Sequence, residues 1–295
     1  MKYEAIDRLK GQHSVAKMAR VLEINQSAYY QWRKRQEANL IKRDAEKALV
    51  EKVRSVFDDN RQVYGYRKMM RALQAQGINI SIYKVRRIMR ENGLFSVTGH
   101  KWRPKRESNR NGRYLDNLLN QDFKVDAPNK VWAGDITHIK TSLGWVQMAV
   151  VLDLCTKEVL GYKIARNATT ELVKQALADA LVNSGKNYEQ KIIFHSDRGT
   201  QYTSKSFQAM CEACNITSSM SAAGCPYDNA VVESFFSTAK REEIFRKQYA
   251  GIDEAKTHIF DYIELFYNRK RIQQGLNYLS PKEYRKKLEM TKVEQ

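Results

Sequence analysis

The sequence predicts an α/β protein in which a mixed β-sheet with helices follows an all-α N-terminal region. Two helix-turn-helix patterns occur in the first hundred residues, whereas the alternating and short apolar segments that are typical of strands begin near residue 131. The chain has 295 residues, 42% of them hydrophobic, which is enough for one core domain with smaller attachments. It contains no run of about 18 apolar residues and no signal peptide, so we expect a cytoplasmic protein that does not enter a membrane.

The positive charge is concentrated in the first part of the chain. Residues 1–113 contain 27 Lys and Arg against 11 Asp and Glu, a net charge of +16, whereas residues 114–295 contain 24 against 22, a net charge of +2. This asymmetry indicates that the front third binds a polyanion. A membrane surface is the alternative to nucleic acid, but no basic amphipathic helix with an aromatic or leucine-rich opposite face stands out. The charge pattern therefore favours nucleic acid.

Residues 1–36 match a first helix-turn-helix. The first of its helices has apolar residues on one face, namely Val15, Met18, Ala19 and Leu22. A break at residues 23–26 precedes a second helix, residues 28–35, which Ser27 can cap. This second helix combines aromatic residues with a basic run that we predict to contact DNA, namely Arg33, Lys34 and Arg35.

Residues 37–97 match a second, helix-turn-helix-like DNA-binding unit. A helix that begins at Tyr66 leads to a turn at Gly77, and Ser81 can cap the next helix, which Gly93 can terminate. One face of this last helix is apolar, and the other carries predicted DNA contacts, namely Lys84, Arg87 and Arg90. A solvated face is the ordinary interpretation of one such helix. Two tandem units that carry nearly all of the excess charge favour DNA.

After an aperiodic segment at residues 98–125, which we predict to be a basic linker, residues 126–290 show the pattern of an α/β domain. Residues 131–140 alternate as a strand that contains Asp135. The elements expected after it are two strands, a helix and a short buried strand, at residues 145–154, 159–164, 172–181 and 191–195. Active sites in such sheets form at the carboxyl ends of strands, so Asp197 lies beside Asp135 if the first and last of these strands are neighbours.

The segment around Glu233 predicts an amphipathic helix. Its buried stripe consists of Val232, Phe235, Phe236 and Ala239. Glu233, Ser237 and Lys240 form a second stripe at i, i+4 and i+7, where a carboxylate can bind metal and a lysine can contact a phosphate. Three converging carboxylates in a strongly basic protein call for divalent metal ions and a polyanionic substrate. This combination indicates an enzyme that cuts or joins nucleic-acid strands.

Each of these residues also has an ordinary structural interpretation. An Asp at a strand end is usually a turn or cap residue, and a helical Glu is usually solvated. Asp153 and Asp228 are rival acidic residues, and His195 can be a hydrogen-bonded neighbour of the sheet instead of a base. We interpret the CxxC pair of Cys211 and Cys214 as a buried helix face, because no second pair and no spaced histidines accompany it. Spacing alone leaves the three-acid hypothesis about even with these alternatives.

A series of motifs covers nearly all of residues 126–290. They are residues 132–137 (WAGDIT), 195–204 (HSDRGTQYTS), 219–221 (SMS), 227–230 (YDNA), 233–236 (ESFF), 240–242 (KRE), 267–271 (YNRKR) and 276–281 (LNYLSP). In this order and spacing the series resembles a bacterial insertion-sequence transposase, the OrfB-type transposase of the retroviral-integrase-like DDE superfamily. Residues 64–67 (YGYR) resemble the upstream helix-turn-helix of the same family.

The resemblance implies a ribonuclease H-like catalytic core with a mixed five-stranded sheet. It places the catalytic and metal-binding triad at Asp135, Asp197 and Glu233, and a DNA-contacting lysine at Lys240. The triad would hold two Mg²⁺ (or Mn²⁺) ions about 4 Å apart for phosphoryl transfer. Water would first free a 3′-OH at the element end, and this hydroxyl would then attack another phosphodiester. The implied DNA partners are the terminal inverted repeats and the target DNA, which makes the protein nucleoid-associated.

The resemblance further implies a homo-oligomer on DNA and a possible companion OrfA protein, since no leucine-heptad segment of the kind found in OrfA is visible. The chain departs from the family at Gln273, where His often follows Arg-Ile. It has no HHCC zinc module, which favours a transposase over a viral integrase. Two rival functions are a nuclease that cuts without joining and a helix-turn-helix regulator with an inactive core. A complete triad speaks against the regulator.

Overall fold

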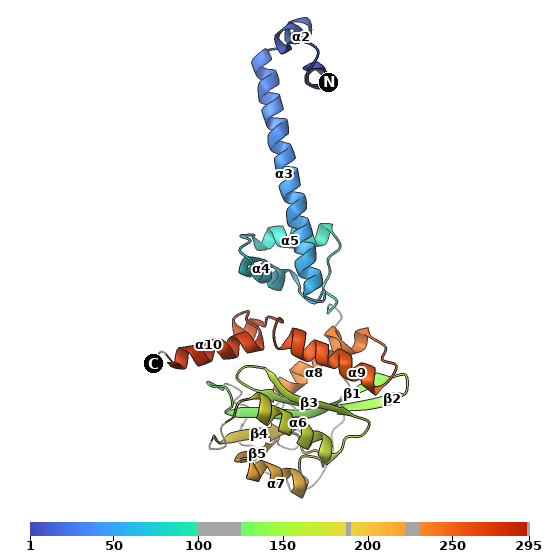
Figure 1. Cartoon of the computed structure of the whole chain (residues 1–295), viewed down its shortest axis with the longest axis vertical. Coiled ribbons are helices and arrows are strands. Elements are labelled where there is room, and N and C mark those ends of the chain that lie inside the picture. The colour runs from blue at the N-terminus through green and yellow to red at the C-terminus, as the bar shows by residue number, and fades with distance from the viewer. Residues whose placement is uncertain (99–124, 187–189, 222–229, 294–295) are drawn as a thin grey trace.

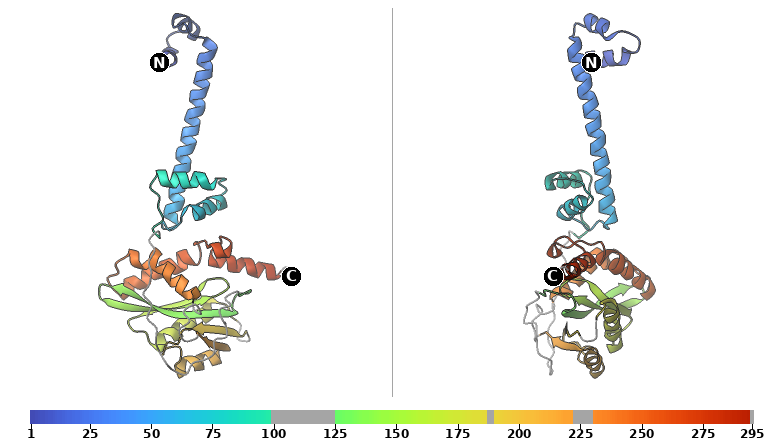
Figure 2. Two further views of the ribbon diagram at one scale, coloured as in Figure 1. Left: turned by 180° about the vertical axis from the view of Figure 1, so that it is seen from behind. Right: turned by 60° about the vertical axis from the view of Figure 1, so that its left-hand side comes forward.

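The computed structural model describes residues 1–98, 125–186, 190–221 and 230–293. The molecule is elongated, with a small group of helices at one end of a single long helix and the α/β domain beyond its other end (Figure 1). The two further views show the same separation (Figure 2). The predicted basic linker lies outside the described residues, apart from its first and last positions.

The first helical unit contains α1 (Lys2–Leu9), α2 (Val15–Val21) and the beginning of α3 (Gln26–Asp59). The side chain of Asn25 accepts a hydrogen bond from the backbone N–H of Ser27 at 2.8 Å. Asn25 is therefore the N-cap, and the prediction that Ser27 caps this helix is wrong. The helix is also longer than expected. It has 34 residues and runs through the boundary that we expected between residues 36 and 37. Residues 36–48 contain neither Gly nor Pro, so nothing in them ends a helix.

The second helical unit contains the end of α3, α4 (Tyr66–Ala75) and α5 (Ile82–Glu91). The side chain of Ser81 accepts a hydrogen bond from the backbone N–H of Lys84, which confirms it as the N-cap of α5. Gly77 and Gly93 have positive φ angles of 79° and 66°, as the predicted turn and helix end require. The three helices meet through buried apolar side chains, which include Val53, Val56, Phe57, Met69, Leu73, Val85 and Ile88.

The sheet has five strands in the order β3-β2-β1-β4-β5. They are β1 (Val131–Thr141), β2 (Gly144–Asp153), β3 (Val159–Ala165), β4 (Ile192–Ser196) and β5 (Ile216–Met220). The first three strands pair antiparallel, and β4 pairs parallel with both β1 and β5. This mixed sheet confirms the predicted fold class and the expected contact between the first strand and the strand before Asp197. The spacing of apolar residues had located four of the strands and not β5.

Helices cover both faces of the sheet, and each face has its own apolar core. The helical elements after β3 are α6 (Thr170–Asn183), α7 (Lys205–Ala213), α8 (Ala230–Glu242), η2 (Ile244–Arg246), α9 (Ile252–Phe260), η3 (Asp261–Tyr267), η4 (Gln274–Leu276) and α10 (Pro281–Val293). Side chains of α6 and α7 pack on one face, and those of α8, α9 and η3 pack on the other. Across the described ranges, no helix is long and apolar enough to cross a membrane.

Candidate active site

Asp135 and Asp197 are brought together by the register of two parallel strands. Gly134 of β1 is paired with Ser196 of β4, so the next residue along each chain is an aspartate. Asp135 is partly exposed, and its Oδ1 accepts a hydrogen bond from the backbone N–H of Ile136 at 2.7 Å. Asp197 is exposed directly after β4. The two aspartates are therefore neighbours at the carboxyl end of β4, as predicted.

The loop after Asp197 holds this carboxylate in place. Its Oδ1 accepts a hydrogen bond from the backbone N–H of Gly199 at 2.9 Å. A Cβ atom at residue 199 would lie 2.9 Å from that same oxygen and 3.0 Å from Oε1 of Gln201, closer than carbon packs against oxygen. A side chain at this position would therefore displace the Asp197 carboxylate or the Gln201 amide from its present place.

Glu233 lies in the first turn of α8, outside the buried stripe of the helix. The stripe expected to be buried is buried, as Val232, Phe235, Phe236 and Ala239 show. Glu233 is exposed, and Ser237 and Lys240 are partly exposed, so the second stripe also has the predicted accessibility. The amphipathic pattern of the sequence correctly oriented this helix.

The pKa shifts of Asp135 and Lys240 indicate that the charged side chains of this region influence one another. Burial raises the pKa of Asp135 to about 8, and the negative charges of Asp197 and Glu233 add to the rise. The backbone hydrogen bond from Ile136 and the positive charge of Lys240 act in the opposite direction. Burial lowers the pKa of Lys240, and the charge of Asp135 opposes that change. Three charged side chains that sequence analysis singled out, Asp197, Glu233 and Lys240, therefore act on the carboxyl group of Asp135.

This donor set fits a hard divalent cation. Carboxylate oxygens are the ligands that Mg²⁺ and Mn²⁺ prefer, and like-charged carboxylates disfavour one another until a cation neutralises them. Within the described ranges, no three carboxylate, histidine or cysteine side chains already stand close enough to form a complete metal site. Residues 222–229, which precede α8 and include the rival Asp228, lie outside the described residues. The fit therefore rests on the chemistry of Asp135, Asp197 and Glu233.

The other candidates have structural roles. Asp153 is fully buried and accepts hydrogen bonds from the backbone N–H groups of Asn129 at 2.7 Å and Thr156 at 2.8 Å, so it caps the turn after β2. His195 is also fully buried, and its two ring nitrogens lie 2.9 Å from Ser219 Oγ and 3.2 Å from Ser221 Oγ. It is the hydrogen-bonded neighbour of the sheet that we considered as an alternative to a base.

The CxxC pair lies at the end of α7. Cys211 is buried among the apolar side chains on that face of the sheet, and Cys214 follows as the C-cap residue. The interpretation of this pair as a helix face is therefore correct for Cys211, and Cys214 is partly exposed.

The predicted DNA contacts on α5 are all exposed, but they differ in their surroundings. Lys84 and Arg90 have no ion pair among those found in the described residues, whereas Arg87 binds Glu46 of α3 at 2.6 Å. Sequence analysis missed Tyr83, whose side chain is 82% exposed on the same face. Tyr83 precedes the two arginines by four and seven residues, and this helical spacing is the signal that could have found it.

The predicted DNA contacts on α3 lie in the first helical unit. Arg33 is partly exposed and pairs with Glu37 at 3.1 Å, one helical turn away. Lys34 and Arg35 are exposed, and Arg35 donates a hydrogen bond to the backbone carbonyl of Gln31.

Known families match most of this chain. The Integrase core domain family matches residues 125–226, and a second family of the same description matches residues 233–288. A family described as Transposase matches residues 1–60, and the HTH-like domain family matches residues 44–102. The fold and these matches define the class of protein, which is an integrase core domain preceded by helix-turn-helix units.

Similar proteins extend over nearly the whole length. Transposase InsF for insertion sequence IS3A, from Escherichia coli (strain K12), is 34% identical over 287 residues, which are 97% of this chain and 99% of the relative. The transposase for insertion sequence element IS904, from Lactococcus lactis subsp. lactis (strain IL1403), is 39% identical over 241 residues, 81% of this chain and 93% of the relative. The chain belongs to this family of insertion-sequence transposases.

Solved structures also align with part of this chain. The simian T-cell lymphotropic virus intasome in complex with PP2A regulatory subunit B56 gamma aligns with a TM-score of 0.46 at 16% identity, covering 73% of this chain and 70% of that chain. The HTLV-2 integrase catalytic core domain in complex with magnesium aligns with a TM-score of 0.41 at 17% identity, covering 54% and 98%.

Proposed function

We propose that this transposase cleaves the ends of its insertion sequence and joins them to target DNA by metal-dependent phosphoryl transfer. The observation that carries the proposal is the convergence of Asp135, Asp197, Glu233 and Lys240 beside the carboxyl end of β4, where its pairing with β1 ends. Two acids and a lysine around the carboxyl group of Asp135 are poorly suited to a purely structural role, because the negative charges repel one another in a partly buried place.

Each side chain has a distinct part in the reaction. Asp135, Asp197 and Glu233 would hold two Mg²⁺ or Mn²⁺ ions, which activate the attacking oxygen and stabilise the leaving oxygen when bound. Lys240 follows Glu233 by about two helical turns and faces the same side, so it contacts a phosphate of the strand that the carboxylates address. Gly199 keeps Asp197 fixed while DNA enters.

The basic side chains of the two helical units would hold the element end. Lys84, Arg87 and Arg90 on α5, together with the added Tyr83, face one side of the second unit. Arg33, Lys34 and Arg35 belong to the first unit. We further infer that the protein works as a homo-oligomer on DNA and with a companion OrfA protein. The terminal inverted repeats and the target DNA are its substrates.

The first test replaces each acid by its amide. Asp135→Asn, Asp197→Asn and Glu233→Gln should each lower cleavage and strand transfer about 1,000-fold or more, as loss of an essential catalytic group commonly does. DNA binding should change little, because the positive charge lies elsewhere in the chain. The assay incubates the full chain with Mg²⁺ and an end-labelled duplex of the genomic DNA that flanks the reading frame.

Glu171→Gln is the matched control, because it removes an exposed carboxylate of α6 whose only ion pair among the described residues is with a lysine one turn away. Near-normal cleavage by any one of the three amide variants would remove that residue from the mechanism. Cutting without joining would support the nuclease, and wild-type binding without cutting in Mg²⁺ or Mn²⁺ would support the regulator with an inactive core.

A further inference from the structure

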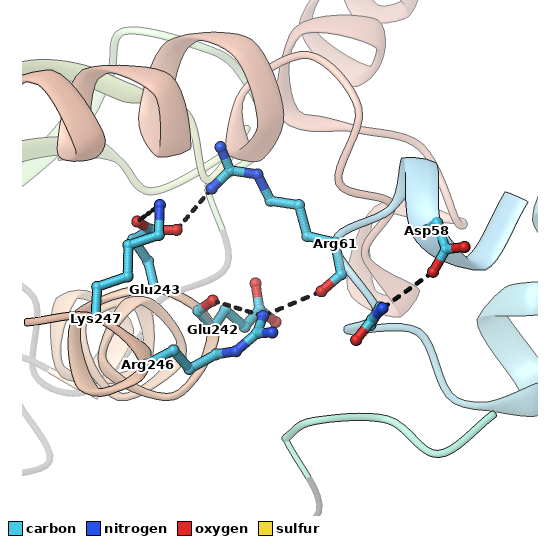
Figure 3. Close-up of a pocket in the computed structure, with 7 residues that line it drawn as sticks. Asp58, Arg61, Glu242, Glu243, Arg246 and Lys247 are labelled. Atoms are coloured by element: carbon cyan, nitrogen blue, oxygen red, sulfur yellow. Dashed lines mark hydrogen bonds and ion pairs between the residues drawn. The ribbon is translucent and has the colours of Figure 1, made fainter. Parts of the chain in front are cut away.

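A polar cluster joins the second helical unit to the carboxyl end of α8, the helix that begins near Glu233. We call Arg61, Tyr64, Glu242, Glu243 and Arg271 the joint. Figure 3 shows part of it, with Arg61 reaching from the turn after α3 toward Glu243, which lies just after α8.

The first contact of the joint is a partly enclosed ion pair. Arg61 Nη1 lies 2.7 Å from Glu243 Oε2, and the Glu243 side chain is only 3% exposed. Lys247 binds the other oxygen of that carboxylate at 2.9 Å, and Arg246 donates a hydrogen bond to the backbone carbonyl of Arg61 at 3.1 Å. Arg61 has a φ angle of 55°, in the left-handed region that residues other than glycine rarely adopt. The turn therefore has an uncommon backbone conformation at Arg61, the residue whose side chain binds Glu243.

The second contact is a buried tyrosine between two segments of chain. The Tyr64 side chain is 1% exposed. Its hydroxyl donates to the backbone carbonyl of Lys270 at 3.0 Å and accepts from the backbone N–H of Ile272 at 2.9 Å. Residues 64–67 (YGYR) and 267–271 (YNRKR), which sequence analysis had connected only through a family resemblance, therefore meet at one hydroxyl group.

The third contact connects that segment to α8. Arg271 makes two hydrogen bonds to Glu242, with Nε and Nη2 each 2.7 Å from a carboxylate oxygen. Both side chains are buried, and the hydroxyl of Tyr262 donates to the same carboxylate at 2.9 Å. A paired fork of this kind fixes direction as well as distance.

One rigid helix therefore has the candidate active site near its first turn and the joint at its end. α8 has 13 residues, and α5 belongs to the helical unit on the other side of the joint. Val85 and Met69 of that unit belong to the same cluster of buried apolar residues as Phe235 and Val232 of α8. DNA that lies on α5 is consequently held at a fixed distance and angle from Glu233.

We propose that Arg61 and Tyr64 are positioning residues that select which phosphodiester bond is cut, by fixing the DNA-holding unit to the helix that carries Glu233. The inference rests on the proposed function and adds to it the determinant of the cleavage position. Neither residue touches the reacting atoms. Their effect is to set the register between the DNA held by the second unit and the carboxylates.

The experiment maps the cut at single-nucleotide resolution. The full chain, with Tyr64→Phe or Arg61→Ala, is incubated with Mg²⁺ and the end-labelled duplex of flanking genomic DNA. The fraction cut at the main bond should fall about threefold or more as cutting spreads to neighbouring bonds, since small misplacements of reacting groups are costly. Affinity for the same duplex should stay within about twofold, because the phosphate-binding side chains are unchanged.

Tyr29→Phe is the matched control. It also removes the hydroxyl of a fully buried tyrosine, which donates to Asp7 at 3.0 Å, but this contact lies inside the first helical unit. Its cut position should not move. A double-mutant cycle of Arg61→Ala and Glu243→Gln should be non-additive, with the double variant spreading the cut no further than the worse single variant.

Three results would overturn the inference. One is an unchanged cut position in both Tyr64→Phe and Arg61→Ala. Another is a loss of cleavage at every bond in proportion to a loss of DNA affinity, which a merely structural contact would produce. The third is a spread cut in Tyr29→Phe equal to that in Tyr64→Phe. Absence of cutting by the wild-type protein would instead contradict the proposed function itself. If Arg61→Ala does not fold, Tyr64→Phe and Arg61→Lys decide the question.

Discussion

Both helical units of this transposase have a helix-turn-helix pattern in their sequence, but they pack against the rest of the molecule in different ways. In residues 1–48 three side chains are buried, those of Ile6, Ala19 and Tyr29. None of them belongs to the apolar clusters of the catalytic domain. The second unit, in contrast, shares one continuous apolar cluster with α8, α9 and the sheet. The first unit is a small separate body on a long helix, whereas the second contacts the catalytic domain through buried side chains.

This difference shows that two units of one motif can serve different mechanical purposes. Tyr29 stabilises the first unit locally, through its ring against Trp32 at 6.2 Å and its hydroxyl bond to Asp7. Tyr64 stabilises the second unit through contacts with chain more than 200 residues away. A change inside the first unit should therefore stay local, whereas a change inside the second should reach the catalytic domain.

The largest effect is expected at the buried ion pair of the joint. Arg271→Ala leaves the carboxylate of Glu242 buried without its cation, which should cost about 3–5 kcal/mol of unfolding free energy. Arg33→Ala breaks the exposed pair with Glu37 and should cost about 0.2–1 kcal/mol. Urea unfolding of the full-length variants measures both. Equal costs for the two variants would contradict the expected difference between a buried and an exposed ion pair.

A slightly smaller effect is expected in the apolar interior. Met69→Ala and Ile6→Ala each truncate a fully buried side chain and should each cost about 2–5 kcal/mol locally. Met69→Ala should also lower the unfolding temperature of the catalytic domain, because the cluster is shared. Ile6→Ala should leave that temperature unchanged while protease cuts the first unit faster. A lowered catalytic-domain transition in Ile6→Ala would contradict this picture.

A weaker, pH-dependent effect is expected at Lys68 of α4. Burial lowers the pKa of Lys68 from 10.5 to about 8, and the positive charge of Arg271 lowers it further while Glu242 opposes. Between these two values the unfolded chain binds a proton that the folded chain does not, so stability should rise as the pH increases from about 8 to about 10.5. Lys68→Met should remove this rise in the unfolding temperature, whereas Lys17→Met in the first unit should keep it. A rise of equal size in Lys68→Met would assign it to other groups.

The smallest effect is expected in the salt dependence of DNA binding. Arg90→Ala in the second unit and Arg35→Ala in the first should each reduce the slope of log K against log salt by about 1 if each contacts one phosphate. Measured by anisotropy with the flanking duplex, equal reductions would show that both units hold DNA. A reduction in Arg90→Ala alone would sharpen the comparison, since the separate unit would then bind something else.

Local periodicity was enough to predict much of the fold and of the candidate site. The alternation around Asp135 and the stripe around Glu233 depend on neighbours within one or two turns, and the structure reproduces both. The pairing of Asp135 with Asp197 followed from the rule for strand ends. Their proposed role as metal ligands stays a prediction.

The elements that the sequence did not reveal lack such local signals. β5 (Ile216–Met220) is Ile-Thr-Ser-Ser-Met, whose two apolar residues stand at its ends, and pairing with β4 alone defines it. The middle of α3 is exposed on all sides, Leu40 and Ile41 included, so its length showed in no buried apolar stripe. The joint unites residues separated by 182 to 208 positions, as Arg61 with Glu243 and Tyr64 with Ile272. No spacing rule reaches across such distances.

The length of α3 sets the distance between the two helical units. Its 34 residues, at 1.5 Å each, span about 51 Å, whereas one turn of B-DNA measures about 34–36 Å. Where both ends of α3 contact one duplex, the two contacts are more than one turn of DNA apart. The rotation between the two ends of α3 then decides whether both contacts lie on the same side of the duplex. Seven inserted residues would lengthen α3 by about 10 Å and nearly preserve the rotation of the first unit about the helix axis. Two inserted residues would turn the first unit by about 200°. If both units hold one element end as proposed, the number of residues between Gln26 and Asp59 should set the distance between their two contacts on the DNA.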